Sequence, residues 1–123
     1  MELEALTDRV IGCAIEVHRC LGPGLLESAY SLCLAHELKS IGVGFEREKA
    51  ISVAYKGVDI DCGFRIDMLV EEALVVELKA LEKLLPLHRA QLLTYMKIAD
   101  KRVGLLINFN SRILKDGLAR LTL

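Results

Sequence analysis

Three charged side chains stand in an apolar stretch near the middle of the chain. Glu77 and Lys79 lie two positions apart within Val75-Val76-Glu77-Leu78-Lys79-Ala80, which reads as a strand, and Asp67 lies ten residues before Glu77. Side chains of a strand alternate between its two faces, so Glu77 and Lys79 share one face. An interior carboxylate or ammonium is costly unless it is paired or binds a metal. We therefore expect Asp67, Glu77 and Lys79 to meet and to hold a divalent cation.

Whether the two carboxylates meet depends on the length of one hairpin loop. If residues 71–73 form a loop of three, Val70 pairs with Leu74. Counting back along the antiparallel pair then places Asp67 directly opposite Glu77, with their Cβ atoms about 5 Å apart on one face. Two carboxylates that close repel each other and stay ionised only beside a cation. A two-residue loop would place them on opposite faces of the sheet.

One glutamate on a predicted helix is a further candidate. Glu27 lies one turn from Tyr30 and two turns from Leu34, because positions i, i+3 and i+7 align on a helix. The simpler interpretation is a first-turn carboxylate that the helix dipole favours. The functional interpretation is a carboxylate that points inward to a metal site. The local pattern alone favours the simpler one.

A later helix carries a line of three polar residues that can form hydrogen bonds. His88, Gln91 and Tyr95 have the spacing i, i+3 and i+7. They form either a solvated face or the wall of a cleft. The residues expected to face the core from this segment are Leu85, Leu92, Met96 and Ala99.

Hydrophobic periodicity and turn residues predict the elements that position these side chains. In chain order they are helices at about 3–20 and 25–40, strands at 45–55, 58–70 and 74–80, a helix at 86–99 and a strand at 103–109. Gly22-Pro23-Gly24 separates the first two helices, and Pro86 suits the first turn of the third. The strand 103–109 is apolar on both faces, which indicates a central position and is typical of a parallel strand. Residues 112–123 fit a helix or a short strand equally well.

Composition limits the class and the location of the protein. The 123 residues suit a single domain, 1–123, with a core of its own. No apolar run approaches the ~20 residues that cross a bilayer, and the start of the chain lacks the features of a signal peptide. We therefore expect a cytoplasmic protein that does not engage a membrane. The hydrophobic content of 53% and mean hydropathy of +0.37 are high for a monomer and hint at an apolar subunit interface.

The charges are unevenly distributed along the chain. The net charge of −1 gives no overall attraction to nucleic acid. Residues 1–78 carry 7 Lys/Arg against 14 Asp/Glu, whereas residues 79–123 carry 9 against 3. This asymmetry indicates either a phosphate-binding side or two halves that attract each other.

The cysteines form no C-x-x-C pair, and each is expected to be a small buried hydrophobe: Cys13, Cys20, Cys33 and Cys62.

The order of elements, with Asp67 followed by Glu77-Leu78-Lys79, resembles the PD-(D/E)xK nuclease superfamily. More narrowly, Gly24-Leu25-Leu26-Glu27-Ser28-Ala29-Tyr30 is similar to the signature of the GxxExxY protein family. The similarity covers nearly the whole chain and includes Glu16-Val17-His18, Leu21-Gly22-Pro23-Gly24, Val76-Glu77-Leu78-Lys79-Ala80, Gln91-Leu92-Leu93-Thr94-Tyr95 and Gly104-Leu105-Leu106-Ile107-Asn108-Phe109. One departure is that Arg65-Ile66 precede Asp67, with no proline there.

This resemblance implies an α/β fold with a restriction-endonuclease-like α-β-β-β-α-β core, a mixed central sheet flanked by helices, and an extra N-terminal helix. It implies a nuclease that uses Mg²⁺, with Mn²⁺ as an alternative, and that takes nucleic acid, in particular DNA, as its substrate. Asp67, Glu77 and the backbone carbonyl of Leu78 would bind the metal. Glu27 would add an acidic ligand, directly or through water. Enzymes of this fold commonly act as homodimers, so the resemblance also implies a homodimer.

The remaining site residues would act on the water and the phosphate. Lys79 would orient or activate the attacking water and offset charge on the phosphate. Gln91 would steady the water or a phosphate oxygen. Tyr95, His88 and Arg65 would contact the substrate. The catalytic set implied by the resemblance is Glu27, Asp67, Glu77, Lys79 and Gln91.

Three functions remain open on the sequence. The first is a Mg²⁺-dependent nuclease. The second is a catalytically silent nuclease-like domain that binds nucleic acid or protein, which the low net charge and few aromatic residues favour. The third is a structural protein in which the acidic residues pair with Arg65 and Lys79. The first predicts metal binding that depends on Asp67 and Glu77, whereas the third predicts no binding and a loss of stability on mutation.

Overall fold

The computed structural model describes residues 2–123, so the first residue of the predicted domain 1–123 lies outside them. Its elements are α1 (Leu3–Leu21), α2 (Glu27–Ser40), β1 (Phe45–Tyr55), β2 (Val58–Val70), β3 (Leu74–Lys79), α3 (Pro86–Ala99), β4 (Val103–Asn108), a short 3-10 turn η1 (Leu114–Gly117) and β5 (Leu118–Thr122). The predicted helices and strands are confirmed, with boundaries that differ by two residues at most. The undecided C-terminal segment is the 3-10 turn followed by a strand.

The strands form one five-stranded sheet in the order β1-β2-β3-β4-β5. β1, β2 and β3 are an antiparallel meander, β3 and β4 pair in parallel, and β5 returns antiparallel to β4. Parallel neighbours need a crossover connection, and α3 supplies it between β3 and β4. The predicted mixed sheet of an α/β fold is therefore confirmed.

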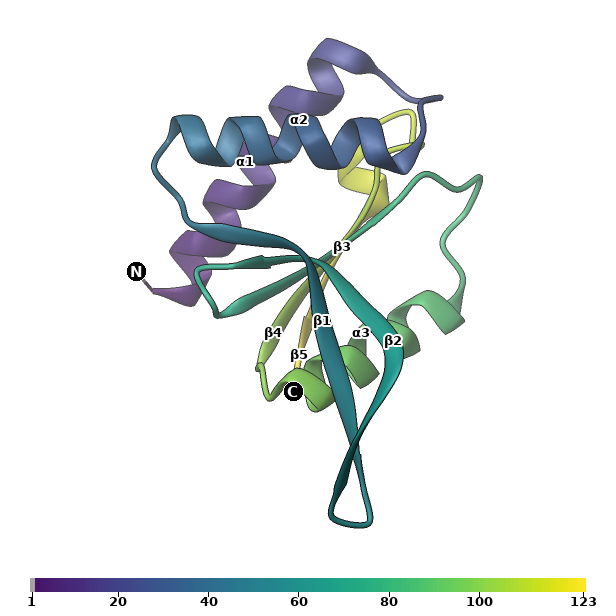
Figure 1. Cartoon of the computed structure of the whole chain (residues 1–123). Coiled ribbons are helices and arrows are strands. Elements are labelled where there is room, and N and C mark those ends of the chain that lie inside the picture. The colour runs from purple at the N-terminus through teal and green to yellow at the C-terminus, as the bar shows by residue number, and fades with distance from the viewer. Residues whose placement is uncertain (1) are drawn as a thin grey trace.

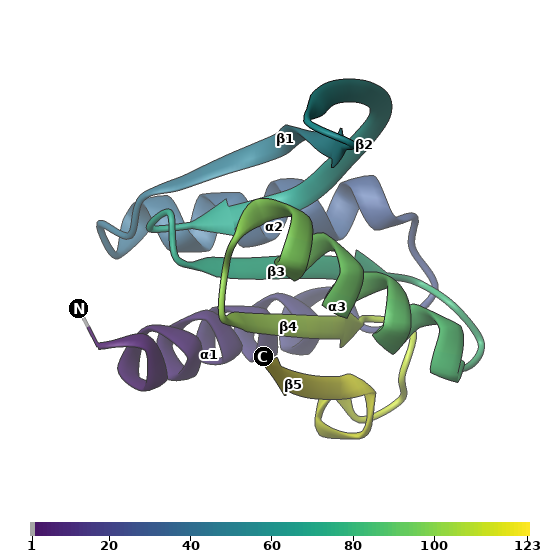
Figure 2. The ribbon, with the colours of Figure 1, turned by 90° about the horizontal axis from the view of Figure 1, so that it is seen from below.

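Helices cover both faces of the sheet (Figures 1 and 2). α1 and α2 lie on one face, where Val76 and Leu78 of β3 join the larger core. α3 lies on the other face, where Val75 joins a smaller core. The predicted alternation along β3 is thus observed, and its residues Leu74 to Leu78 are all buried because both faces are covered.

Residue 104 allows α3 to lie close to β4. A Cβ atom at Gly104 would stand 2.5 Å from the Met96 sulfur and 3.2 Å from the Leu92 methyl groups. Both side chains belong to the buried face of α3. The absence of a side chain at Gly104 therefore lets this helix approach the sheet, and with it the polar residues on its exposed line.

The hairpin between β2 and β3 has the loop length on which the site prediction depends. Val70 pairs with Leu74 and Met68 pairs with Val76, so the loop has three residues. Glu71 and Glu72 turn the chain with φ angles of 51° and 53°. The predicted register is confirmed, and it brings Asp67 and Glu77 to the same level of the two strands.

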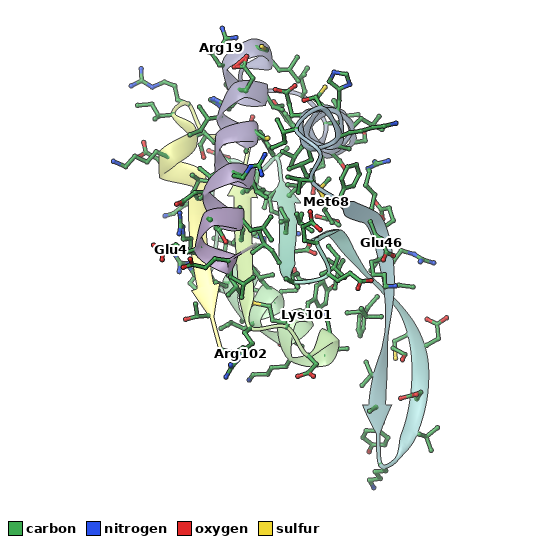
Figure 3. The ribbon with its side chains drawn as sticks, turned by 90° about the vertical axis from the view of Figure 1, so that its left-hand side faces the viewer. Glu4, Arg19, Glu46, Met68, Lys101 and Arg102 are labelled. Atoms are coloured by element: carbon green, nitrogen blue, oxygen red, sulfur yellow. The ribbon has the colours of Figure 1, made fainter. Side chains whose placement is uncertain are left out.

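β1 and β2 continue beyond the rest of the sheet as a two-stranded arm, residues 50–65. It projects away from the helices in Figure 1, and residues 54–65 are all exposed. In Figure 3 the side chains of its outer part extend on both sides with no other element against them, whereas Met68 lies among packed side chains. The register of the arm shifts between Ile51 and Val53.

Two burial predictions are wrong. Leu85 is 51% exposed, because it precedes the first turn of α3 instead of lying on its buried face. Cys20 and Cys62 are also exposed, since Cys20 lies in the last turn of α1, the end that Arg19 marks in Figure 3, and Cys62 lies on the uncovered arm. All four cysteines are free thiols.

No helix within residues 2–123 combines the length and apolar character needed to cross a membrane.

Candidate functional site

Asp67 and Glu77 lie where β2 and β3 separate. The ladder between these strands ends at Met68 and Val76, and each carboxylate takes over a backbone N–H beyond that point. The Asp67 N–H donates to Glu77 Oε1 at 3.1 Å, and the Leu78 N–H donates to Asp67 Oδ2 at 2.8 Å. The carboxylates therefore replace ladder bonds that the diverging backbones cannot make. This reciprocal bonding fixes both side chains relative to the two strands.

The side chains of β2 change faces at Asp67. Ile66 belongs to the core beneath α3, whereas Met68 belongs to the core beneath α1 and α2. Residues two apart on a regular strand share a face, so the strand is irregular here. The cause lies across the pair in β1, where Glu48 has a φ of 54°. Glu48 stands between the pairs that join Arg47 to Met68 and Lys49 to Ile66, which places it opposite Asp67.

The surroundings of Glu77 disfavour the ionised form of its carboxyl group. Its exposed fraction is 6%. Burial, and next the charge of Asp67, raise the pKa of Glu77 from 4.5 to about 8, although the Asp67 N–H and the charge of Lys79 oppose the shift. A buried carboxyl beside a second one favours its protonated form unless a cation lies nearby. The site therefore has a free-energy preference for added positive charge.

Lys79 is half-buried at the end of β3, and its backbone is held on the side of β4. It pairs with Asn108 of β4, and its carbonyl accepts the Phe109 N–H at 2.8 Å. Its charge acts on Glu77 and on Glu27. The three ion pairs within residues 2–123 are Arg19–Glu16, Lys49–Glu46 and Arg120–Asp8. Lys79 thus lies near two carboxyl groups without being tied to either.

Asn108 extends the pairing of β3 and β4 beyond their last residues. Its side-chain Oδ1 accepts the Leu81 N–H at 2.9 Å, and its Nδ2 donates to the Leu81 carbonyl at 2.9 Å. An amide side chain has the same donor and acceptor as a peptide group, so it continues the ladder by one step. This contact fixes the chain that leaves Lys79.

Glu27 reaches the site because the loop before α2 is locked. Gly22 and Gly24 turn that loop with φ angles of 68° and 103°. The fully buried Tyr30 donates its hydroxyl proton to the Gly22 carbonyl at 2.7 Å and accepts the Leu25 N–H at 3.1 Å. Its ring stacks on Phe109 with centroids 4.5 Å apart. The Tyr30 hydroxyl thus ties the loop from Gly22 to Leu25 to α2, which begins at Glu27.

Replacing Tyr30 by phenylalanine should lower the free energy of unfolding by about 1–2 kcal/mol, because the variant leaves the Gly22 carbonyl and the Leu25 N–H without partners. The ring stacking is retained in this variant. Urea denaturation followed by far-ultraviolet circular dichroism measures the change. An unchanged free energy of unfolding would contradict the locking role of the hydroxyl.

A cavity of about 220 Å³ joins Glu27 to Asp67. Its lining is polar and comes from α2, β1, β2 and β3: Glu27, Ser28, Ser31, Arg47, Glu48, Asp67 and Leu78. The Glu27 side chain is at the outer part, since the residue is exposed. Burial, and to a smaller extent the charge of Asp67, raise its pKa against the opposing charge of Lys79. The functional interpretation of Glu27 thus gains support over the purely local one.

The line of polar residues on α3 is only partly directed at the site. Burial raises the pKa of Tyr95, and the charges of Glu77 and Asp67 add to the shift. Its ring is 5.9 Å from that of Phe64 at the base of the arm. His88 begins the helix instead, since its Nδ1 accepts the Leu85 N–H at 2.8 Å. Gln91 is exposed on the same helix.

A family model described as the PD-(D/E)XK nuclease superfamily matches residues 4–121. The chain belongs to this superfamily. No curated protein and no solved structure gives a match. The narrower similarity to GxxExxY proteins remains a prediction. The PD-(D/E)XK superfamily contains metal-dependent nucleases. This membership suggests a chemical role for Asp67, Glu77 and Lys79 that the fold alone would not suggest.

The donor set fits the divalent ion that the PD-(D/E)XK superfamily implies. Two carboxyl groups lie side by side, one of them buried and raised in pKa, and hard divalent cations prefer such oxygen ligands. Within residues 2–123 no group of three or more His, Cys, Asp or Glu side chains is placed to hold a metal ion. Asp67 and Glu77 are thus the two closely placed carboxyl groups of this site, and Glu27 lies further from that pair.

Other polar residues of the site were not among the sequence predictions. Arg47, Ser28, Ser31 and Glu48 line the cavity, and Asn108 fixes the chain beyond Lys79. Ser31 lies one turn after Glu27 on α2, so helical spacing from Glu27 is a signal that could have identified it. No sequence signal marks the irregularity at Glu48, because glutamate rarely adopts a positive φ. Arg65, a predicted substrate contact, is exposed on β2 beside Ile66.

Proposed function

We propose that the protein is a metal-dependent nuclease that hydrolyses phosphodiester bonds of DNA. The observation that carries this proposal is the reciprocal bonding of Asp67 and Glu77, with Lys79 two residues further along the same strand. The match to the PD-(D/E)XK nuclease superfamily supports it independently. The homodimer and the cytoplasmic location expected from the sequence remain predictions.

In the proposed site, Asp67 and Glu77 provide carboxylate ligands to Mg²⁺ or Mn²⁺, and the carbonyl of Leu78 provides a third oxygen. Glu27 acts through a water molecule, in keeping with its more exposed place in the cavity. When bound, such an ion lowers the pKa of a coordinated water and offsets charge that develops on the phosphate. A metal ligand must be deprotonated, so Glu77 would hold the ion as its carboxylate.

The remaining residues bind and orient the substrate and the water. Lys79 has no ion-pair partner within residues 2–123 and so keeps its ammonium group available for the attacking water and a phosphate oxygen. Gln91 steadies the same water from α3. Tyr95, the Nε2 side of His88, and Arg65 contact the nucleic acid on the side of the arm and α3.

The direct test is incubation of the protein with labelled single-stranded, duplex and branched DNA in the presence of Mg²⁺ or Mn²⁺. We expect cleavage of at least one of these substrates, abolished by EDTA and reduced at least 100-fold in Asp67→Asn. The asparagine can still accept the Leu78 N–H through its side-chain oxygen, so the variant should fold. Circular dichroism of both proteins provides the control.

Two outcomes would contradict the proposal. If the folded protein binds DNA and metal but cuts none of the substrates, it is a catalytically silent binding module. If Asp67→Asn cuts as well as the wild type, the activity arises from another site or from a contaminant. Isothermal titration with Mn²⁺ tests the metal site itself, because a site at Asp67 loses metal affinity in the variant whether or not the protein cuts DNA.

A further inference from the structure

The cavity beside Asp67 contains an arginine that is held on one side only. Arg47 is an exposed residue near the start of β1, and its Nε donates to Ser31 Oγ at 3.1 Å. Ser31 is itself 7% exposed and belongs to the buried face of α2. A fixed helix therefore holds the guanidinium group through one of its five donors, and the others remain for a ligand.

Local backbone geometry brings Arg47 into the cavity. Arg47 and Glu48 both line it, although successive residues of a regular strand point to opposite faces. The φ of 54° at Glu48 explains this, because a left-handed residue within a strand rotates the chain and changes the direction of the neighbouring side chains. Such a conformation is unfavourable for a residue with a side chain, and strain of this kind tends to occur at functional sites.

Among the described residues, Arg47 forms no ion pair with the carboxyl groups that line the same cavity. Glu27, Glu48 and Asp67 line the same cavity, yet Arg47 belongs to none of the three ion pairs found within residues 2–123. An arginine among carboxylates would ordinarily form a two-point ion pair with one of them. The bond to Ser31 instead keeps the guanidinium apart, which suits a group that must receive an anion from outside.

We propose that Arg47 is a phosphate-binding residue, which grips the DNA backbone next to the bond that is cut, and that Ser31 positions it. This proposal rests on the proposed nuclease function. The planar guanidinium group suits two-point binding of a phosphate. It also explains how a cavity lined by three carboxyl groups accepts a polyanion: the metal offsets charge at Asp67, and Arg47 offsets it on the β1 side.

The test measures DNA affinity without turnover. Fluorescence anisotropy with a labelled oligodeoxynucleotide and Ca²⁺ in place of Mg²⁺ compares the wild type with Arg47→Gln, Arg47→Lys and Lys49→Gln. We expect Arg47→Gln to weaken binding by roughly 10- to 100-fold, as the loss of a charged hydrogen-bonding group does. Arg47→Lys keeps the charge without the two-point geometry and should lie between. Lys49→Gln removes the same charge two residues along, outside the cavity lining, and should change affinity less than threefold.

A second arm makes the result independent of cleavage. Titration of inorganic phosphate into the Ca²⁺-loaded protein should show binding to the wild type and its loss in Arg47→Gln, with Mn²⁺ affinity and melting temperature unchanged. If Arg47→Gln binds oligonucleotide and phosphate as the wild type does, the inference is wrong while the nuclease proposal stands. If Arg47-dependent binding is found without cleavage, Arg47 is a phosphate-binding residue of a silent domain and the nuclease proposal fails. Equal losses in Arg47→Gln and Lys49→Gln, or a parallel loss of melting temperature, would also overturn it.

Discussion

Replacing Glu77 by glutamine should make the metal-free protein more stable at neutral pH and should abolish its affinity for Mg²⁺. Wild-type Glu77 is 6% exposed and lies beside a second carboxyl group, and burial, with the charge of Asp67, raises its pKa to about 8. Glutamine keeps an oxygen that can accept the Asp67 N–H, but it carries no charge. A gain in stability from loss of a proposed functional group is the opposite of what a structural ion pair predicts.

The sign of the pH dependence follows from the two states of the chain. Below pH 4.5 the carboxyl is protonated both folded and unfolded, so it contributes no pH dependence. Between 4.5 and about 8 the unfolded chain releases this proton while the folded chain retains it, and stability falls as the pH rises. Above about 8 both states are ionised and the full penalty remains. At pH 7 this penalty is about 3 kcal/mol.

The measurement is the difference in free energy of unfolding between Glu77→Gln and the wild type, from urea titrations in EDTA between pH 5 and 8. The difference should favour the variant increasingly as the pH rises, and saturating Mg²⁺ should reduce or reverse it, because only the wild type binds the ion. Glu82→Gln, at an exposed position, is the matched control and should show no such trend. A constant difference, or a less stable variant at pH 7.5, would exclude this view of Glu77.

Replacing Lys79 by methionine should lower the rate of DNA cleavage by about 10²- to 10⁴-fold, the range typical of a lost proton-transfer or charge-stabilising group. The protein should still fold, because the contacts of Lys79 seen in the ladder are made by its backbone, through Asn108 and Phe109. Methionine retains the apolar stem of the half-buried side chain. Metal affinity should not fall, since Lys79 supplies no ligand.

Single-turnover cleavage with excess enzyme separates this effect from weaker substrate binding. Mn²⁺ titration and urea denaturation of the same variant test the two quantities that should be preserved. Lys83→Met, which removes an exposed lysine four positions along, provides the comparison for a general loss of positive charge. A cleavage rate within fivefold of the wild type would remove Lys79 from the proposed mechanism.

The sequence was sufficient for the parts of the site that follow strand and hairpin rules. The three-residue loop fixed the register of β2 and β3, and it brought Asp67 level with Glu77. The same rules could not show that the ladder ends one pair earlier, so that side chains take over the backbone bonds. That detail depends on where two twisted strands diverge, which is a property of the whole sheet.

Contacts between distant segments were harder to predict. Tyr30 was placed correctly on the line of Glu27, but its bonds to the preceding loop depend on two glycines with positive φ and on Phe109 from the far end of the chain. The direction of the Arg47 side chain depends on the irregularity at Glu48, which strand periodicity does not predict. His88 read as one of a polar line, whereas its ring nitrogen satisfies the start of its own helix.

One side of the candidate site is rigid, whereas the side next to the arm is flexible. Glu77 and Lys79 belong to a strand that pairs with β4 along its whole length and is buried from Leu74 to Leu78, so its amides should exchange with solvent only on global unfolding. Arg47 and Glu48 lie at the root of a hairpin whose outer residues contact nothing else, and such segments open at much lower cost. A long polymer pressing on the arm would therefore move the outer hairpin, while the carboxylates and the guanidinium group that Ser31 holds stay in place.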